Sequence, residues 1–163
     1  MNAPITNVRK ALIALAAMAA TIFAGCAGMG MSGGDMVKLS GAQEVPIVST
    51  PASGSGTITV NSDGSVSGSI TTTGVAGVAA HIHEGAMGSN GPVIVPLVKT
   101  ADNVWSVPAG AKLTDAQLAS YKAGKLYVNV HSAANKGGEI RAQITPTAMT
   151  TMAAPMPSSS SRY

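Results

Sequence analysis

The 163-residue sequence contains little cysteine, few aromatic residues and few charges. Its single Cys excludes an internal disulfide and any zinc site built from several cysteines. Charged residues account for 10% of the chain, against ~25% in an ordinary globular protein. Aromatic residues account for 3%, which leaves almost nothing to stack on nucleic-acid bases. These shortages argue against a disulfide-stabilised fold and against a nucleic-acid partner.

Long apolar runs are equally scarce, and the main one lies near the start of the chain. Ala11–Phe23 follows Arg9 and Lys10 and is shorter than the ~20 residues of a membrane span. A basic start followed by a short apolar run is typical of a signal peptide, which we predict at 1–25. Ala24-Gly25-Cys26 resembles the lipobox of bacterial lipoproteins, which implies that Cys26 is lipidated. The chain is therefore expected to be exported and anchored to the cell-envelope membrane, on the outer membrane or the periplasmic face in a Gram-negative cell. Ordinary secretory cleavage nearby is the alternative.

The expected cleavage changes the charge of the chain. Arg9 and Lys10 are two of the ten Lys and Arg residues, and 1–25 contains no acid, so the formal net charge falls from +3 to +1. A nearly neutral chain has no electrostatic footprint for nucleic acid. The Gly-rich segment 26–36 is expected to be a lipidated flexible tether, and the Pro- and Ser-rich segment 146–163 a disordered tail. The folded domain is expected at 37–145, which is long enough for one core.

Within this domain, apolar and polar residues alternate with a period of two, which predicts strands. The pattern is clearest at 57–60 and 66–71, where pairing Val60 with Val66 keeps one face apolar and leaves Gly64 in a short left-handed loop. Further strands are expected at 78–84, 93–98, 104–107, 126–131 and 139–144. One short helix is expected at 115–123, between Thr114 as N-cap and Gly124. The pattern indicates an all-β fold, an antiparallel β-sandwich or barrel with one short helix.

Four blocks of the sequence resemble the CHRD domain, named after chordin and found in many bacterial secreted proteins. They are Leu39–Pro46 (LSGAQEVP), His81–Gly85 (HIHEG), Asn90–Leu97 (NGPVIVPL) and Leu126–Ser132 (LYVNVHS), the last leading to Gly138–Arg141 (GEIR). The blocks stand in the order of the family and cover about 37–145. The resemblance implies an immunoglobulin-like β architecture. It implies no activity, because the biochemical role of the family is mostly unassigned.

All three histidines fall in two of these blocks, which makes them the main candidates for site chemistry. Residues i and i+2 of a strand share a face, so His81 and His83 project together while the alternate aliphatic residues, Val78 among them, face the core. The same parity places His131 on the outer face of the strand at 126–131. If the two strands are neighbours, the three rings converge on one metal ion.

Polar residues of the next hairpin join this group. Pairing 126–131 with 139–144 sets His131 across from Glu139, and Asn129 across from Arg141. Glu139 is therefore expected to orient the His131 ring or to serve as a ligand itself, with Asn129 and Arg141 as further supports of the site. The alternative is that Arg141 neutralises Glu139 on the surface.

Three neutral imidazoles suit a transition metal and leave one coordination position open. The His-x-His pair is similar to the copper ligands of copper/zinc superoxide dismutases, which implies copper, with zinc as the alternative, and a superoxide-dismutase-like barrel. The chain has no fourth His, so a copper-only site of three histidines is the most that its residues permit. Thioethers favour Cu(I), and six methionines flank the domain, although low-complexity bias explains them nearly as well. They are Met29, Met31, Met36, Met149, Met152 and Met156.

Three functions remain open from the sequence. The first is a metal- or copper-handling protein without turnover, and the second is a superoxide-dismutase-like oxidoreductase. The third is a structural or adhesive module without metal, whose protein partner the sequence does not identify. Histidines more than ~10 Å apart would favour the third, since one ion with ~2.0 Å bonds cannot bridge them. The sequence has no Walker-type phosphate loop and no nucleophile elbow with suitable partners, so no catalytic residue is assigned.

Overall fold

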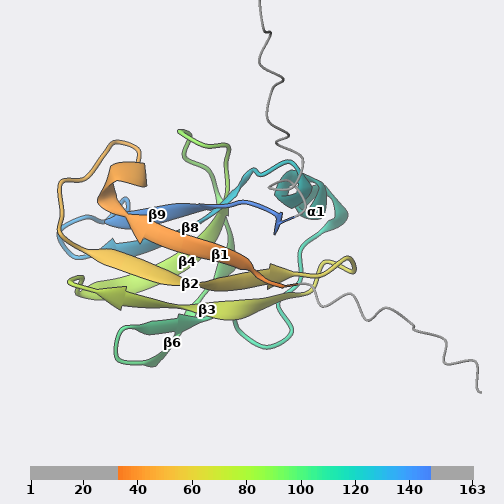
Figure 1. The fold of residues 1–163 in the computed structure, drawn as a ribbon, viewed down its shortest axis with the longest axis horizontal. Helices are drawn as coiled ribbons and strands as arrows, with labels where there is room; N and C mark the ends of the chain where they lie inside the picture. The colour runs from red at the N-terminus through yellow and green to blue at the C-terminus, as the bar shows by residue number, and fades with distance from the viewer. Residues whose placement is uncertain (1–32, 148–163) are drawn as a thin grey trace, which may run out of the picture. The chain divides into compact units, whose positions relative to one another are not determined.

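An antiparallel sheet of nine strands dominates the computed structural model, which describes residues 33–147 (Figure 1). The strands are β1 (Asp35–Ser40), β2 (Ser53–Val60), β3 (Val66–Thr73), β4 (Gly77–Glu84), β5 (Val93–Pro96), β6 (Val98–Ala101), β7 (Val104–Ser106), β8 (Leu126–Ser132) and β9 (Ile140–Ile144). They are ordered β5-β4-β8-β9-β1-β2-β3-β7-β6 in the sheet. A 3₁₀ helix, η1 (Gly41–Gln43), follows β1, and one α-helix, α1 (Asp115–Lys122), precedes β8. The predicted all-β class with one short helix is confirmed.

The two ends of this sheet meet through one residue. At one end β5 pairs with β4, and at the other end β6 pairs with β7. Only Leu97 separates β5 from β6, and its N–H donates to the carbonyl oxygen of Ala80 in β4 at 2.9 Å. The sheet therefore curls into a nearly closed barrel. The single strand predicted at 93–98 is wrong, because the buried Leu97 turns the chain from one end of the sheet to the other.

The β2–β3 hairpin has the predicted register. Val60 pairs with Val66, and the N–H of Asn61 donates to the carbonyl oxygen of Ser65 at 2.9 Å. Gly64 has a φ of 84°, which is the left-handed conformation that glycine adopts without steric cost. Matching of apolar faces was therefore sufficient to fix this register.

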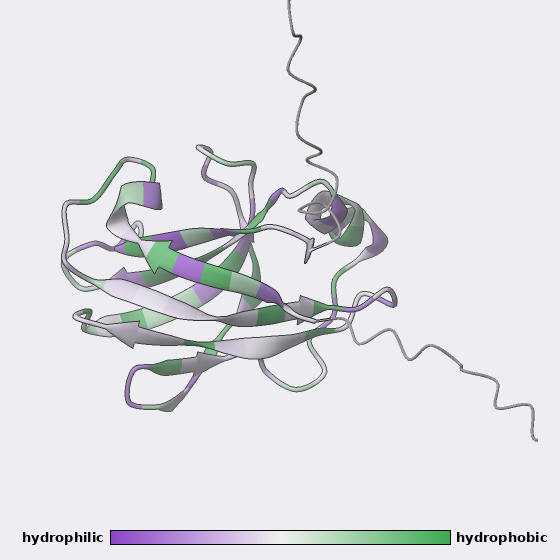
Figure 2. Ribbon diagram, viewed as in Figure 1, coloured by the Kyte–Doolittle hydropathy of each residue, from purple (hydrophilic) through white to green (hydrophobic). Residues whose placement is uncertain are grey.

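The core lies inside the barrel and is formed by alternate residues of nearly every strand. Figure 2 shows the resulting alternation of hydrophobic and hydrophilic residues along β1. Its largest fully buried aliphatic side chains, each under 2% exposed, are Val37, Ile58, Ile70, Ile82, Leu126, Val128, Val130, Ile140 and Ile144. Because these residues occupy the inner face, the polar residues between them project from the barrel.

Two local predictions need correction. β1 was not predicted as a strand, and it begins at Asp35, two residues before the expected start of the domain. Its buried residues Val37 and Leu39 are too few to establish a period. Val78 was predicted to face the core, yet it is 63% exposed, because the pairing of β4 with β8 shifts register between Gly77 and Ala79.

The helix α1 forms where the sequence predicts it and packs against the core of the barrel. Thr114 caps it through a capping box with Gln117, and Gly124 ends it with a φ of 67°. Leu118 and Tyr121 are partly buried and pack against the core. The helix thus covers the barrel end rather than presenting a separate surface.

Several predictions fall outside the described residues. They are the signal peptide at 1–25, lipidation of Cys26, most of the tether and tail, and five of the six flanking methionines. The sixth, Met36, is 75% exposed on β1. In the part of the chain that the structure describes, no helix has the length and apolar character needed to cross a membrane.

Candidate metal centre

Three neighbouring strands, β4, β8 and β9, present polar side chains on the face away from the core. The pairing places His81, Asn129 and Arg141 in one row across the three strands, and His83, Tyr127 and Gln143 in the next. His131 lies on β8, two residues beyond Asn129, opposite Ala79 of β4. The condition set by the sequence, that the two histidine strands be neighbours, is therefore met.

The three imidazole rings lie close together. Their centroids are 4.9 Å apart for His81 and His131, 5.5 Å for His81 and His83, and 5.8 Å for His83 and His131. One possible ligand nitrogen from each ring lies within 4.8 Å of the other two. The structure therefore brings together all three histidines that the sequence singled out, far inside the ~10 Å beyond which one ion cannot join them.

Backbone carbonyl groups fix the tautomers of two of the rings. His83 Nδ1 lies 3.0 Å from the carbonyl oxygen of Gly91, and His131 Nδ1 lies 2.9 Å from that of Lys136. A carbonyl oxygen can only accept a hydrogen bond, so Nδ1 carries the proton in both rings. In each neutral ring the Nε2 lone pair is then free to accept a proton or a metal.

The third ring is linked to the cluster itself. His81 Nδ1 lies 3.0 Å from His131 Nε2. Because His131 Nε2 carries no proton when Nδ1 donates to Lys136, His81 Nδ1 must be the donor. The cluster therefore contains one internal hydrogen bond, from His81 to His131.

His83 is the buried member of the cluster. It is 7% exposed, whereas the other two rings are partly exposed. Its Nε2 is buried and has no hydrogen-bond partner. Buried polar atoms are nearly always paired, so this lone pair marks an unfilled interaction.

The surroundings favour neutral rings. Burial lowers the pKa of His81, and the neighbouring His131 and His83 lower it further. Burial also lowers the pKa of His83, against the opposing hydrogen bond to Gly91, and the charges of His131 and Arg141 add to the lowering. Neutral imidazole is the form that binds metals.

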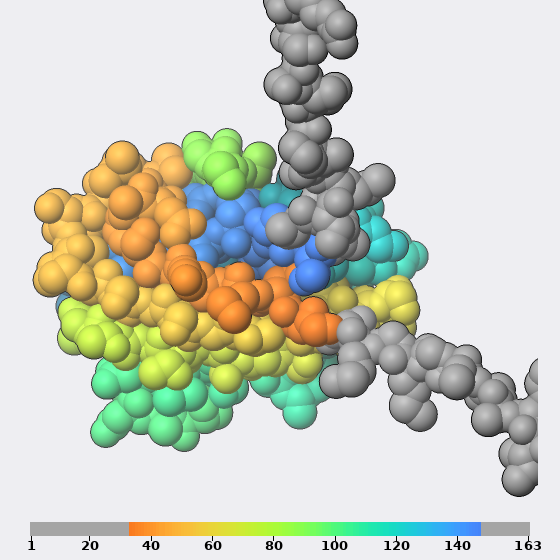
Figure 3. All heavy atoms as spheres, in the orientation of Figure 1, coloured from red at the N-terminus to blue at the C-terminus, as the bar shows by residue number. Residues whose placement is uncertain are grey.

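The outer face of β8 and β9 is covered rather than open to solvent. Asn129 is 2% exposed and Arg141 is 1% exposed. The segment 41–48 reaches over Asn129, whose Nδ2 donates to both carboxylate oxygens of Glu44 at 3.0 and 3.1 Å. The segment 85–91 is held by Arg141, which donates to the carbonyl oxygens of Ala86 and Ser89. Figure 3 shows these two segments, orange and light green, bordering the blue strand β9.

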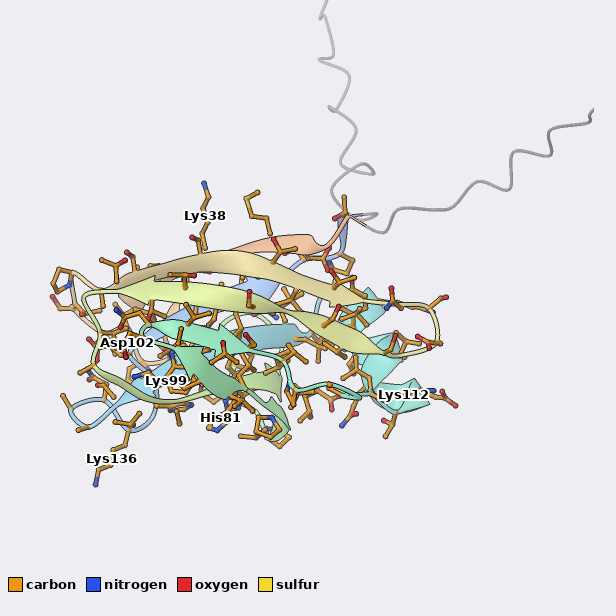
Figure 4. The ribbon with its side chains drawn as sticks, turned by 90° about the horizontal axis from the view of Figure 1, so that it is seen from below. Lys38, His81, Lys99, Asp102, Lys112 and Lys136 are labelled. Atoms are coloured by element: carbon orange, nitrogen blue, oxygen red, sulfur yellow. The ribbon has the colours of Figure 1, made fainter. Side chains whose placement is uncertain are left out.

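The expected surface site is therefore only half open. In Figure 4 His81 projects from the side of the barrel opposite Lys38, and Lys136 projects on the same side as His81. His83 forms the buried wall of the cluster. An ion from solvent would thus meet His81 and His131 first and His83 last.

Glu44 has the most perturbed carboxyl group near the site. Burial raises its pKa to about 7, against the attraction of Arg141 and the hydrogen bonds from the Val45 backbone and Asn129. The amide oxygen of Asn129, Oδ1, is buried without a partner. Glu44 and Asn129 thus form a buried polar pair that joins the loop 41–48 to β8, the strand that carries His131.

Glu139 occupies a different place from the one expected. Its Oε1 accepts a hydrogen bond from Thr50 Oγ1 at 2.9 Å, and hydrogen bonding, most of all from Ser132, lowers the pKa of its carboxyl group. The His131 ring is oriented by the carbonyl oxygen of Lys136 instead. Arg141 turns toward the segment 85–91 and not toward Glu139.

Three residues that contact or orient the cluster had no signal in the sequence, and neither had Glu44, which is bonded to the neighbouring Asn129. Tyr127, Gly91 and Lys136 act through ring stacking or through backbone carbonyl groups, which residue type does not reveal. Glu44 lies 85 residues from Asn129 in the chain. The order of strands places Tyr127 beside His83, but Gly91, Lys136 and Glu44 lie in loops, whose path the strand pattern does not give.

Comparison with known families finds the CHRD domain at residues 36–144. This range contains β2 to β9 and all but the first residue of β1. No match was found among curated proteins or among solved structures.

Proposed function

Residues 36–144 belong to the CHRD domain family, and on this fold we propose that His81, His83 and His131 bind one transition metal ion, copper in preference to zinc. The observation that carries the proposal is the buried, unpartnered Nε2 of His83. A lone pair withdrawn from water without a partner costs free energy, and a metal ion supplies the missing interaction.

The other two rings support the same reading. With His131 Nδ1 tied to a carbonyl group, its Nε2 lone pair faces the neighbouring His81 ring at 3.0 Å. An ion that enters there displaces one hydrogen bond and gains ligands from both rings. Carbonyl groups that hold the far nitrogen of a ring are the usual support of histidine ligands.

The ligand type favours copper. All three ligands are imidazole nitrogens, and the affinity of such sites for divalent metals is higher for Cu(II) than for Zn(II). The three histidines leave room for a water molecule on the ion. The role that follows is capture of copper by an exported domain.

We also propose that the lipid on Cys26 holds this domain at the envelope membrane. The supporting feature is the order of segments at 9–26, basic, apolar and then small residues before the only Cys of the chain. Mass spectrometry of the protein from a bacterial membrane fraction tests it. A lipid mass on Cys26 supports the anchor, and an unmodified Cys26 in a soluble fraction contradicts it.

The metal proposal is tested by titrating the purified protein with Cu(II) and Zn(II). We expect one saturable site and a Cu(II) electron paramagnetic resonance spectrum with nitrogen splitting. All three histidines of the chain belong to the cluster, so imidazole nitrogen can come only from these residues. The variant with His81→Ala and His83→Ala should lose this spectrum.

A matched control is Lys136→Ala, which removes an exposed side chain beside the site and keeps the carbonyl group that holds His131. It should bind copper as the parent does. Absence of saturable binding in the parent protein, or binding that survives loss of both histidines, would overturn the proposal.

A further inference from the structure

The ring of His83 is held by residues that are not among the proposed ligands. Tyr127 lies opposite His83 in the pairing of β4 with β8. The two rings are stacked, with an interplanar angle of 6° and centroids 4.8 Å apart. Tyr127 is 2% exposed, so its ring has almost no freedom to move. The plane of the His83 ring is therefore set by its neighbour.

The other face of the Tyr127 ring is occupied as well. The guanidinium carbon of Arg141 lies 3.4 Å from the centroid of the Tyr127 ring. A cation over the face of an aromatic ring is attracted to it. His83, Tyr127 and Arg141 thus form a stack of three planar groups, one from each of the strands β4, β8 and β9.

Tyr127 is also linked to His83 by two hydrogen bonds through the backbone of Gly91. The N–H of Gly91 donates to the Tyr127 hydroxyl at 3.2 Å, and the carbonyl oxygen of Gly91 accepts from His83 Nδ1 at 3.0 Å. No other residue type fits at Gly91, because a Cβ there would lie 1.7 Å from the carbonyl oxygen of Glu84. One side chain therefore controls both the plane of the ring and the group that fixes its tautomer.

Arg141 also holds the segment that contains Gly91. It donates to the carbonyl oxygens of Ala86 and Ser89 and to Asn90 Oδ1, at 3.0 to 3.3 Å. These acceptors belong to the segment that leads into Gly91. The stack and the segment are consequently one rigid unit around His83.

We propose that Tyr127 is the positioning residue that makes His83 the preorganised anchor of the metal site. Arg141 supports it in this role. His81 and His131, which are more exposed and bonded to each other, rotate onto the ion after His83 has been placed by the stack. This inference rests on the proposed metal binding and adds that the affinity depends on a tyrosine that does not touch the ion.

The test compares two tyrosines in the full chain. Tyr127→Phe keeps the ring and removes the acceptor for the N–H of Gly91, and Tyr127→Leu removes the stack. Tyr121→Phe is the matched control, because Tyr121 donates its hydroxyl to Asp35 on the far end of the barrel. Each protein is titrated with Cu(II) alone and with Zn(II) alone, and its thermal unfolding and Cu(II) resonance spectrum are recorded.

Loss of support for a ligand typically weakens metal binding by 10- to 100-fold. We expect about tenfold weaker copper binding for Tyr127→Phe and a larger loss, up to about 100-fold, for Tyr127→Leu, both with altered nitrogen splitting. Tyr121→Phe should lower thermal stability and leave affinity and spectrum unchanged. A merely structural role of Tyr127 would make the two Phe variants alike.

The outcomes separate this inference from the metal proposal. If the parent protein binds no metal, the proposed function itself fails. If the parent binds copper, and Tyr127→Phe matches Tyr121→Phe in affinity and spectrum, the metal site stands and the role of Tyr127 is overturned. The Phe variant keeps the buried ring, so the test does not depend on Tyr127→Leu folding.

Discussion

His81 Nδ1 donates a hydrogen bond of 3.0 Å to His131 Nε2, so two of the proposed ligands are bonded to each other. The bond requires His81 to carry its proton on Nδ1, and His131 also carries a proton on Nδ1, held by Lys136. A metal ion on His131 Nε2 takes the lone pair that accepts this bond. The His81 proton must then move to Nε2, or the ring must rotate to present Nε2.

We predict that zinc loading changes the tautomer or the orientation of His81 but leaves the tautomer of His83 unchanged. Proton–nitrogen correlation spectra of the imidazole rings measure this directly, and Zn(II) is suitable because it is diamagnetic. His83 and His131 should remain Nδ1-protonated before and after loading. A spectrum in which His83 changes tautomer would contradict the assignment made from its bond to Gly91.

The pH dependence of metal affinity follows from the same rings. The pKa values of His81 and His83 lie below the usual 6.5 because burial disfavours the charged form of both rings. The neighbouring His131 lowers both values further. Protons therefore compete with the metal only at lower pH. We predict a copper affinity that is nearly constant from pH 8 to pH 6.5 and falls below that range.

Titration calorimetry in weakly coordinating buffers at several pH values measures this profile. A steady rise in affinity between pH 7 and pH 9 would instead identify ligands of higher pKa. Those ligands could not be His81 and His83, whose pKa values are lowered.

The raised pKa of Glu44 predicts that the stability of the folded protein falls as the pH rises, whereas copper affinity falls as the pH drops. Its folded-state pKa of about 7 exceeds the ordinary value of 4.5, so the folded protein holds a proton that the unfolded chain releases. Its contribution is complete below pH 4.5 and is lost as the pH rises toward 7. We predict that the parent loses about 2 kcal/mol more stability than Glu44→Gln between pH 5 and pH 8, after allowance for solvent screening.

Urea unfolding of both proteins at the two pH values gives the difference. The lowered pKa values of His81 and Glu139 also affect stability, but they do so equally in parent and variant. Identical pH profiles would mean that Glu44 is ionised throughout this range in the folded state.

The sequence predicted the parts of the molecule that depend on local pattern. Strand parity placed His81, His83 and His131 on the outer face, and face matching set Asn129 opposite Arg141. It could not show that this face is covered, because Glu44 reaches Asn129 from 85 residues away. Polar residues read as exposed therefore proved to be buried and hydrogen-bonded.

Gly137 and Gly138, two adjacent residues just before β9, differ in how closely they pack against the site. A Cβ on Gly138 would lie 2.2 Å from Asn129 Nδ2 and 2.6 Å from Glu44 Oε1, and its φ of 139° disfavours a side chain. Gly137 has nothing within 4 Å of its Cβ position. We predict that Gly138→Ala costs about 2–4 kcal/mol of stability, because it strains the backbone and disrupts a buried polar pair.

Gly137→Ala should change stability by less than about 0.5 kcal/mol, as surface substitutions usually do. Gly138→Ala should also weaken copper binding, because the same segment carries the Lys136 carbonyl group that holds His131. Equal unfolding midpoints for the two variants would show that the loop relaxes around the added methyl group.

Asp35 joins three distant parts of the chain and provides a stability prediction remote from the metal site. Its carboxylate accepts hydrogen bonds from the hydroxyl of Tyr121 on α1 and from both the N–H and the hydroxyl of Thr147. It is 3% exposed, so its removal leaves these donors without a charged acceptor. We predict that Asp35→Ala lowers stability by about 2–3 kcal/mol, as expected for loss of charge-assisted hydrogen bonds, while copper affinity is unchanged.

Asp102→Ala, at an exposed turn, is the control and should unfold like the parent in urea. Loss of copper binding in Asp35→Ala while the protein remains folded would show that this end of the barrel is coupled to the histidines.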